Sequence, residues 1–167
     1  HLGHKGMAQG VRNFQDEYYH DEFIIDSWNS IVKSKKDLTI IPGDITLETP
    51  KHYHLLDRLN GRKIVGLGNH DLHQHVRLLL NHVESVFGVW KYKGYIISHV
   101  PLHPKEITKY RANIHGHLHH GRVLDENGNE DSKFVNVCAE VIGYRPVTLE
   151  EILMIRQRKR MLNEEIG

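Results

Sequence analysis

The fold is decided by the stretch Ile64-Val65-Gly66-Leu67-Gly68-Asn69-His70-Asp71. Its apolar and small residues run directly into Gly-Asn-His-Asp, a pattern typical of a buried strand that ends in a tight turn with polar side chains. Open α/β sheets bind their ligands just outside the carboxyl ends of their strands. We therefore expect a central strand at 62–67 with functional side chains directly after it.

Three other stretches have the same form, an apolar run followed by polar side chains. They are Leu38-Thr39-Ile40-Ile41-Pro42-Gly43-Asp44, Tyr95-Ile96-Ile97-Ser98-His99 and Ala112-Asn113-Ile114-His115-Gly116-His117-Leu118-His119. A parallel arrangement of these strands would bring all four polar ends together. Carboxylate and imidazole groups gathered in this way are metal ligands, so the sequence predicts a metal site.

The other hydrophobic patterns predict an α/β protein with mixed sheets. We expect helices at 14–33, 48–60, 72–82, 104–110 and 148–162, and further strands at 38–41, 86–90, 94–98, 112–115 and 134–138. A short turn at 91–93 and a hairpin turn at 125–129, which contains the favoured Asn-Gly pair, join neighbouring strands. The segment His1–Gly6 is glycine-rich and is typical of a loop that follows a strand.

The composition is that of an ordinary globular protein, with 39% hydrophobic and 26% charged residues in a chain of one-domain length. The 22 basic and 21 acidic side chains predict no broad attraction to nucleic acid or to a membrane. No apolar run approaches the roughly 20 residues of a membrane span. Cys138 is the single cysteine, which excludes an internal disulfide and indicates a reducing compartment. We therefore expect a cytoplasmic protein without a membrane partner.

Histidine is unusually frequent, with 15 residues against 14 glycines. Neutral imidazole is the commonest metal ligand among side chains. The composition therefore supports the metal site that the strand ends predict.

The polar strand ends resemble the motifs of one enzyme superfamily. In order they are Gly43-Asp44, Gly68-Asn69-His70-Asp71, Ser98-His99 and Gly116-His117-Leu118-His119. The calcineurin-like metallophosphoesterases carry D-x-H, G-D, G-N-H-D/E, a single H and G-H-x-H in this order, and four of the five blocks are complete here. The resemblance spans nearly the whole chain. It implies that residues 1–167 form a single, cap-less α/β domain, with two mixed β-sheets packed as a sandwich and flanked by helices in four layers.

The first block is where the sequence departs from the superfamily. His1 in His1-Leu2-Gly3-His4 matches the histidine of D-x-H, and the aspartate of that block would stand two residues before His1. Either the natural chain continues upstream through that aspartate, at the end of a strand, or the protein lacks one ligand of the first metal.

The resemblance also implies a ligand set for two divalent ions. Asp44 bridges the ions, His1 and His119 complete the first site, and Asn69, His99 and His117 complete the second. Two such ions, about 3.5 to 4 Å apart, clamp a phosphoryl group and supply a bridging hydroxide as the nucleophile. We expect manganese, with iron, zinc or nickel as alternatives, because mixed oxygen and nitrogen ligation suits several first-row metals.

Two neighbouring residues receive catalytic roles from the resemblance. His70 faces the leaving group as a proton donor or transition-state stabiliser, and Asp71 orients the His70 ring. The alternative is that both merely cap a following helix. Three further residues are candidates for substrate contact, although each has a plain structural interpretation as well: His4, Arg12 and His103.

The function that we expect is hydrolysis of a phosphodiester or phosphomonoester at a dinuclear metal site. Phosphodiesters, nucleotides and phosphoproteins all remain open as the phosphate-ester substrate. One alternative is a catalytically silent metal-binding scaffold for protein–protein interaction. Another is a nuclease, for which the basic run Arg156, Arg158, Lys159 and Arg160 would contact a nucleic-acid backbone. The net charge of +1 gives the nuclease little support.

Overall fold

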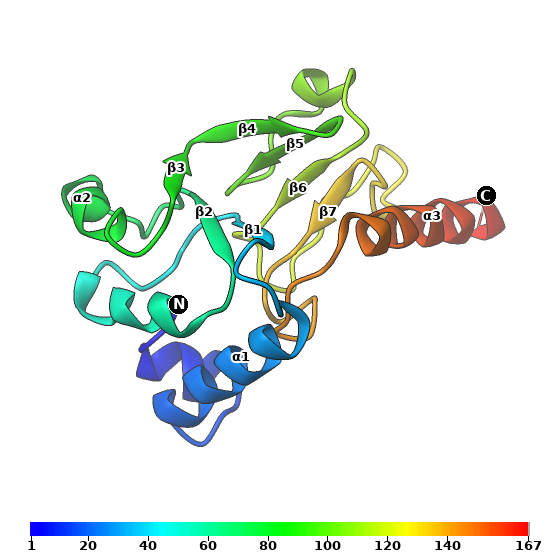
Figure 1. Ribbon diagram of the computed structural model, residues 1–167. Helices are drawn as coiled ribbons and strands as arrows, with labels where there is room; N and C mark the ends of the chain where they lie inside the picture. The colour runs from blue at the N-terminus through cyan, green and yellow to red at the C-terminus, as the bar shows by residue number, and fades with distance from the viewer. Residues whose placement is uncertain (167) are drawn as a thin grey trace.

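Two β-sheets form the centre of the molecule, which a computed structural model describes for residues 1–166 (Figure 1). In the first sheet all strands run parallel, in the order β1 (Leu38–Ile41), β2 (Arg62–Gly66) and β3 (Ser85–Phe87). The second sheet contains β4 (Val89–Tyr92), β5 (Tyr95–Ser98), β6 (Asn113–His115) and β7 (Phe134–Asn136) in that order. There, β4 is antiparallel to β5, and the remaining pairs are parallel.

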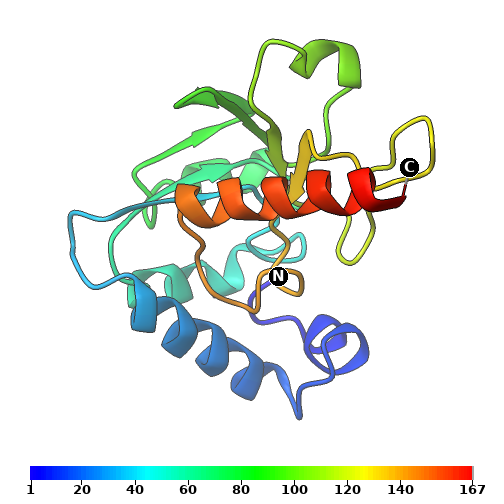
Figure 2. The same cartoon turned by 90° about the vertical axis from the view of Figure 1, so that its right-hand side faces the viewer.

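Helices flank the two sheets. The α-helices are α1 (Glu17–Ile31), α2 (Val76–Leu79) and α3 (Leu149–Ile166). The 3-10 helices are η2 (Pro50–Arg58), η3 (His73–His75) and η4 (Pro104–Ile107), and a π-helical turn, η1, covers Gly6–Val11. In both views α3 lies beside β7, whereas α1 lies near the N-terminal segment (Figure 1, Figure 2). The predicted α/β class, with two sheets flanked by helices, is confirmed; the second sheet is mixed and the first is parallel.

Side-chain alternation along β5 explains how the second sheet buries both of its faces. Tyr95 and Ile97 join the cluster that packs against Ile40 of the first sheet. Ile96 points the other way and packs with Phe134 on the opposite face. Successive side chains of a strand alternate between faces, so an unbroken apolar run is what a strand needs when both faces are covered.

A separate core joins the first sheet to its helices. Val65 of β2 packs with Ile25 and Trp28 of α1 and with Leu56 of η2, all of them buried. This packing fixes the end of β2, where the polar residues of the central stretch begin.

The strand predicted at 86–90 is divided between the two sheets. The chain leaves the first sheet after Phe87, passes Gly88, and enters the second sheet at Val89. The turn predicted at 91–93 is also shifted, because Lys93 and Gly94 form the two-residue loop between paired Tyr92 and Tyr95. Both loop residues have positive φ, 47° and 83°, as a tight hairpin of this kind requires.

Three predicted helices are shorter or tighter than the sequence indicates. The helix expected at 104–110 is the 3-10 helix η4, which ends at Ile107. The helix expected at 48–60 is the 3-10 helix η2, which begins with Pro50 after a Thr49 cap. The helix expected at 72–82 is reduced to η3 and the single turn α2, of which only Leu79 is buried. One buried residue gives too little apolar surface to extend a helix, because most helical stability in proteins comes from packing.

A cavity of about 590 Å³ follows the outer edge of the first sheet. It is lined by all of β1, by residues of the segment 137–152 and by Ile24 and Trp28 of α1, and it extends to His1. Although its sequence is apolar, β1 is half-buried at every position. In the described chain β1 pairs with β2 alone, so its other edge borders this cavity. Within the same residues, no helix is both long and apolar enough to cross a membrane.

Candidate metal centre

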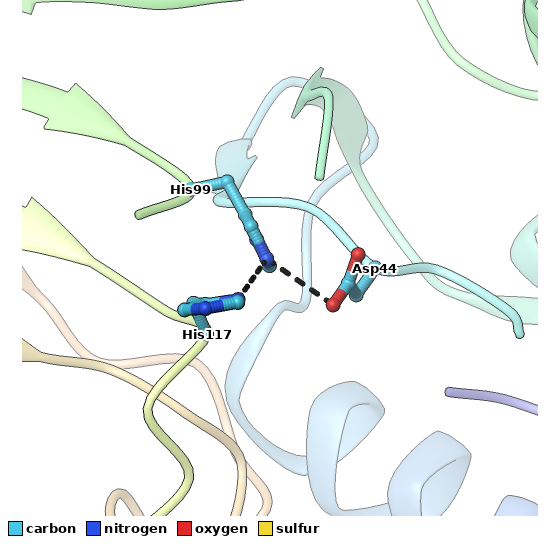
Figure 3. Close-up of side chains that lie close together, drawn as sticks. All are labelled: Asp44, His99 and His117. Atoms are coloured by element: carbon cyan, nitrogen blue, oxygen red, sulfur yellow. Dashed lines mark hydrogen bonds and ion pairs between the residues drawn. The ribbon is translucent and has the colours of Figure 1, made fainter. Parts of the chain in front are cut away.

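The ends of four strands converge, as the sequence predicted. Asp44 follows β1, Asn69 follows β2, His99 follows β5 and His117 follows β6. Ligand atoms of Asp44, His99 and His117 lie within 4.8 Å of one another, and among the described residues they form a candidate metal-binding group (Figure 3).

The donor atoms of this group are as close as ligands around one ion. His99 Nε2 lies 3.1 Å from Asp44 Oδ2, 2.9 Å from Asn69 Oδ1 and 3.2 Å from His117 Nδ1. His117 Nδ1 lies 2.9 Å from the same Asn69 oxygen. Ligands bound at about 2.1 Å with angles of 90 to 109° are roughly 3.0 to 3.4 Å apart. The four side chains therefore fit a divalent metal ion, with two nitrogen and two oxygen donors.

A backbone carbonyl fixes the orientation of His99. Its Nδ1–H donates to the Pro42 carbonyl at 2.7 Å, so Nε2 is the nitrogen that faces the cluster. Burial alone would lower the pKa of His99, but its hydrogen bond with Asp44 raises the pKa above the ordinary value. The Asp44 carboxylate therefore favours a proton on Nε2 in the metal-free molecule, and a metal ion at this nitrogen would compete with that proton.

Asp44 lies between the two expected half-sites. Burial alone would raise its pKa, but hydrogen bonds from His99 and the His70 amide lower it, so Asp44 is ionised. Its Oδ1 accepts the His70 amide at 2.9 Å, whereas Oδ2 faces His99 and, at 3.8 Å, His1 Nε2. One carboxylate oxygen thus points toward members of both half-sites, as a bridging ligand must.

The backbone is strained at three of the predicted ligands. Asp44, His117 and His119 have φ angles of 54°, 67° and 50°, in the left-handed region. This region is uncommon for residues other than glycine, and such strain, of order 1–3 kcal/mol per residue, clusters at functional sites.

Two glycines allow the loops to approach one another. A side chain at Gly43 would meet the Gly66 carbonyl, and one at Gly68 would meet the Asp44 carboxylate. Glycine is therefore sterically required at both positions, which accounts for the Gly-Asp and Gly-Asn pairs of the sequence.

The residues expected to hold the first ion are less tightly assembled than the candidate group. The rings of His1 and His119 stack with centroids 5.8 Å apart. His119 Nδ1 donates to Glu140 Oε1 at 2.9 Å, which leaves its Nε2 to face a ligand. His1 and His119 therefore flank the candidate group, and no measured contact joins His119 to Asp44.

Asp71, which was expected to orient the His70 ring, bonds other groups in this structure. Its carboxylate accepts the backbone amides of Asp44, Ile45 and Gly68 at 2.7, 3.1 and 2.9 Å. Both oxygens are thereby used to hold the ends of β1 and β2 together. The His70 ring instead bonds Glu48 Oε1 at 3.2 Å through Nδ1.

We predict that Asp71→Ala destabilises the metal-free protein by about 3 kcal/mol or more, because three backbone amides lose their acceptor. Urea unfolding measures the effect. Asp57→Ala is the matched control, since the Asp57 carboxylate is more than half exposed and, among the described residues, bonds only His82, and a surface pair contributes about 0–1 kcal/mol. Equal stability of the two variants would contradict the structural role.

The three candidate substrate contacts have structural partners. His4 Nδ1 accepts the Met7 amide, and His103 caps η4 by accepting the Lys105 amide. Arg12 is 5% exposed and pairs with Glu140 at 2.9 Å, so it is not available to a substrate in this conformation. His115 is buried and bonds the Gly116 carbonyl.

Glu140 was not among the residues predicted from the sequence. Burial alone would raise the pKa of this carboxyl, but Arg12 and His119 hold it at about 2. Glu140 follows β7, which is parallel to β6, so the rule of polar residues after parallel strand ends would have found it. Glu48, the partner of His70, follows no strand directly and gave no comparable signal.

Comparison with known proteins gives one relative and two structural neighbours. No protein-family model matches the chain. The uncharacterized protein MJ1445 of Methanocaldococcus jannaschii is 31% identical over 170 residues, which cover 97% of this chain and 90% of the relative.

The two neighbours are solved structures. A protein of unknown function from Aquifex aeolicus, AQ665, superposes with a TM-score of 0.69 at 20% identity, over 93% of this chain and 94% of its own. It shares the fold. A novel archaeal phosphodiesterase reaches a TM-score of 0.49 at 20% identity, over 72% of this chain and 76% of its own. That likeness is too slight to carry an argument. On the sequence identity and coverage, the chain belongs to the family of MJ1445 from Methanocaldococcus jannaschii.

Proposed function

We propose that this protein is a metal-dependent phosphoesterase. The observation that carries the proposal is the convergence of Asp44, Asn69, His99 and His117 at separations of 2.9 to 3.2 Å along the measured contacts. Asp44 Oδ2 also faces His1, which supports a second ion beside the first. The order of the motifs supports membership of the calcineurin-like metallophosphoesterase superfamily.

Two divalent ions, manganese in our proposal, would draw charge from the phosphoryl oxygens and lower the pKa of water. Asp44 would join the two half-sites, with His1 and His119 on one side and Asn69, His99 and His117 on the other. Asn69 contributes a neutral oxygen, so the site keeps net positive charge for an anionic ester. The cytoplasm, indicated by the single cysteine, is the compartment that we propose.

In this proposal His70 acts on the leaving group. Its ring lies outside the candidate metal group, 5.5 Å from the ring of His1, and is about one-third exposed. The Glu48 carboxylate accepts from Nδ1–H, which leaves Nε2 to carry or release the transferred proton. Glu48 thus takes the orienting role that the sequence assigned to Asp71.

We further propose that the outer edge of β1 would accept an apolar strand that ends in the aspartate of the D-x-H block. The cavity of about 590 Å³ along β1 supports this, because an apolar strand is ordinarily covered.

Joining to His1 an apolar, strand-forming segment that ends in Asp and one further residue should therefore stabilise the protein and tighten manganese binding. We expect an increase of at least about tenfold in affinity for one ion, since an anionic ligand is added. Each buried apolar side chain adds about 1.5–3 kcal/mol of stability. The same segment with Ala in place of Asp is the control, and it should stabilise the fold without tightening the metal. An unchanged melting temperature for both versions would contradict the pairing.

The two alternatives have less support. A silent scaffold has no need of a leaving-group residue, and His70 is held by Glu48 at the rim of the site. The nuclease interpretation relied on a basic run in α3. Within that run, Arg156 Nε donates to the Ser132 carbonyl and Lys159 Nζ to the Phe134 carbonyl. These two side chains are therefore used in packing α3 against the second sheet.

The test is release of nitrophenol from bis(p-nitrophenyl) phosphate and from p-nitrophenyl phosphate, with and without Mn²⁺. Metal-dependent turnover of either ester is the expected result, and the preferred ester distinguishes a diesterase from a monoesterase. Metal binding without turnover of either ester would favour the silent metal-binding scaffold.

A further inference from the structure

A chain of buried polar groups runs from the N-terminal loop to His119. Its contacts are Gly3 N to Asp21 Oδ2, Asp21 Oδ1 to His20 Nδ1, His20 Nε2 to Arg12 Nη1, Arg12 Nε to Glu140 Oε1 and Glu140 Oε1 to His119 Nδ1, at 2.7 to 2.9 Å each. The contributing residues come from the first loop, η1 with its C-cap, α1 and the segments after β6 and β7.

The direction of each hydrogen bond follows from the donors present. Arginine has no acceptor, so Arg12 donates to His20 Nε2 and to Glu140. His20 must then carry its proton on Nδ1, which donates to Asp21. At the other end, the Glu140 carboxylate has no proton to give, so His119 donates from Nδ1. These hydrogen bonds define the tautomer of both histidines.

The members of this chain are shielded from water, except at the end that faces the metal centre. His20 is fully buried, and the side chains of Arg12 and Glu140 are 5% and 1% exposed. The side chain of His119 is 39% exposed. A buried ion pair such as Arg12–Glu140 adds little stability compared with apolar packing. Its role is therefore to fix the positions of the two side chains.

We propose that Glu140 is a positioning residue that aims His119 Nε2 at the first metal ion, and that Arg12 holds Glu140 in place. The proposal rests on the proposed function, because it assigns His119 to that ion. A carboxylate behind a ligating imidazole fixes the ring and makes it a better ligand.

Two observations separate this role from a plain structural ion pair. First, Glu140 Oε2 is buried and has no hydrogen-bond partner among the described residues, a costly arrangement that a purely structural residue would avoid. Second, the same chain of contacts reaches Gly3 through Asp21 and so steadies the loop that carries His1. Both ligands expected for the first ion are thereby tied to α1.

The test compares Glu140→Gln with Glu151→Gln in the full chain. Glu151 also bonds an arginine, Arg145, and the Thr148 amide, but it contacts no predicted ligand, so its variant controls for the loss of a carboxylate. Calorimetric titration of the metal-free proteins with Mn²⁺ is expected to show one of two ions bound 10- to 100-fold more weakly in Glu140→Gln. The control should bind both ions as the parent does.

A second measurement keeps the proposal falsifiable if Glu140→Gln does not fold. Nitrogen-15 spectra of the histidine rings in the parent protein should show His119 protonated on Nδ1 and not on Nε2. Protonation on Nε2 alone would overturn the proposal.

The remaining outcomes separate this proposal from the proposed function. Unchanged binding of both ions in Glu140→Gln would overturn the role of Glu140 and leave the phosphoesterase intact. Failure of the parent protein to bind Mn²⁺ would overturn both.

Discussion

Asp44→Asn is expected to abolish metal-dependent hydrolysis, with a loss of at least about 10³-fold in kcat/KM, or roughly 4 kcal/mol of transition-state stabilisation. Asp44 Oδ2 faces His99 at 3.1 Å and His1 at 3.8 Å, so a single substitution removes negative charge from both half-sites. Asparagine retains the size of the side chain and an oxygen for the His70 amide. The fold should therefore survive.

Initial rates with bis(p-nitrophenyl) phosphate at saturating Mn²⁺ measure this loss, and circular dichroism with thermal unfolding checks the fold. Asp57→Asn is a suitable control, because the Asp57 carboxylate is more than half exposed and its hydrogen bonds go to His82. Normal turnover by Asp44→Asn would remove Asp44 from the metal centre.

His70→Ala is expected to lower kcat by about 10²- to 10⁴-fold, the usual contribution of a general acid, while leaving manganese affinity unchanged. The His70 ring bonds Glu48 and has no measured contact with the donor atoms of Asn69, His99 or His117. Its loss should therefore affect proton transfer and not metal binding.

The leaving group distinguishes this role from a general disturbance of the site. p-Nitrophenolate departs readily without a proton, so the loss should be smaller for bis(p-nitrophenyl) phosphate than for a diester with an unsubstituted phenol. His54→Ala is the control, since His54 is exposed and its ring bonds the Lys51 carbonyl. An equal loss for both esters, or weaker metal binding, would argue against a proton donor.

The strand ends were predictable from the sequence for a physical reason. A buried parallel strand needs a continuous apolar run, and the polar residues that follow it must lie at the carboxyl edge of the sheet. That rule alone brings Asp44, Asn69, His99 and His117 together before any contact is known. The rule holds although these residues follow strands of two different sheets, because the carboxyl edges of both sheets meet at the candidate metal group.

The features that the sequence did not predict depend on tertiary contacts. Nothing local in the run around Gly88 shows that β3 and β4 belong to different sheets. Asp71 and His70 are adjacent, yet Asp71 turns to three backbone amides of neighbouring loops. The helix expected at 72–82 is much shorter in the structure. Hydrophobic periodicity does not reveal how little of the apolar surface of this segment is covered by its neighbours.

The central claim is that metal held by Asp44, Asn69, His99 and His117 hydrolyses a phosphate ester. The most direct measurement titrates metal-free protein with Mn²⁺ and follows bound metal and nitrophenol release from bis(p-nitrophenyl) phosphate in the same sample. We predict no release without metal, a rate that rises in step with binding, and no rise in Asp44→Asn. Saturation with Mn²⁺ without release from this diester or from p-nitrophenyl phosphate would contradict the claim.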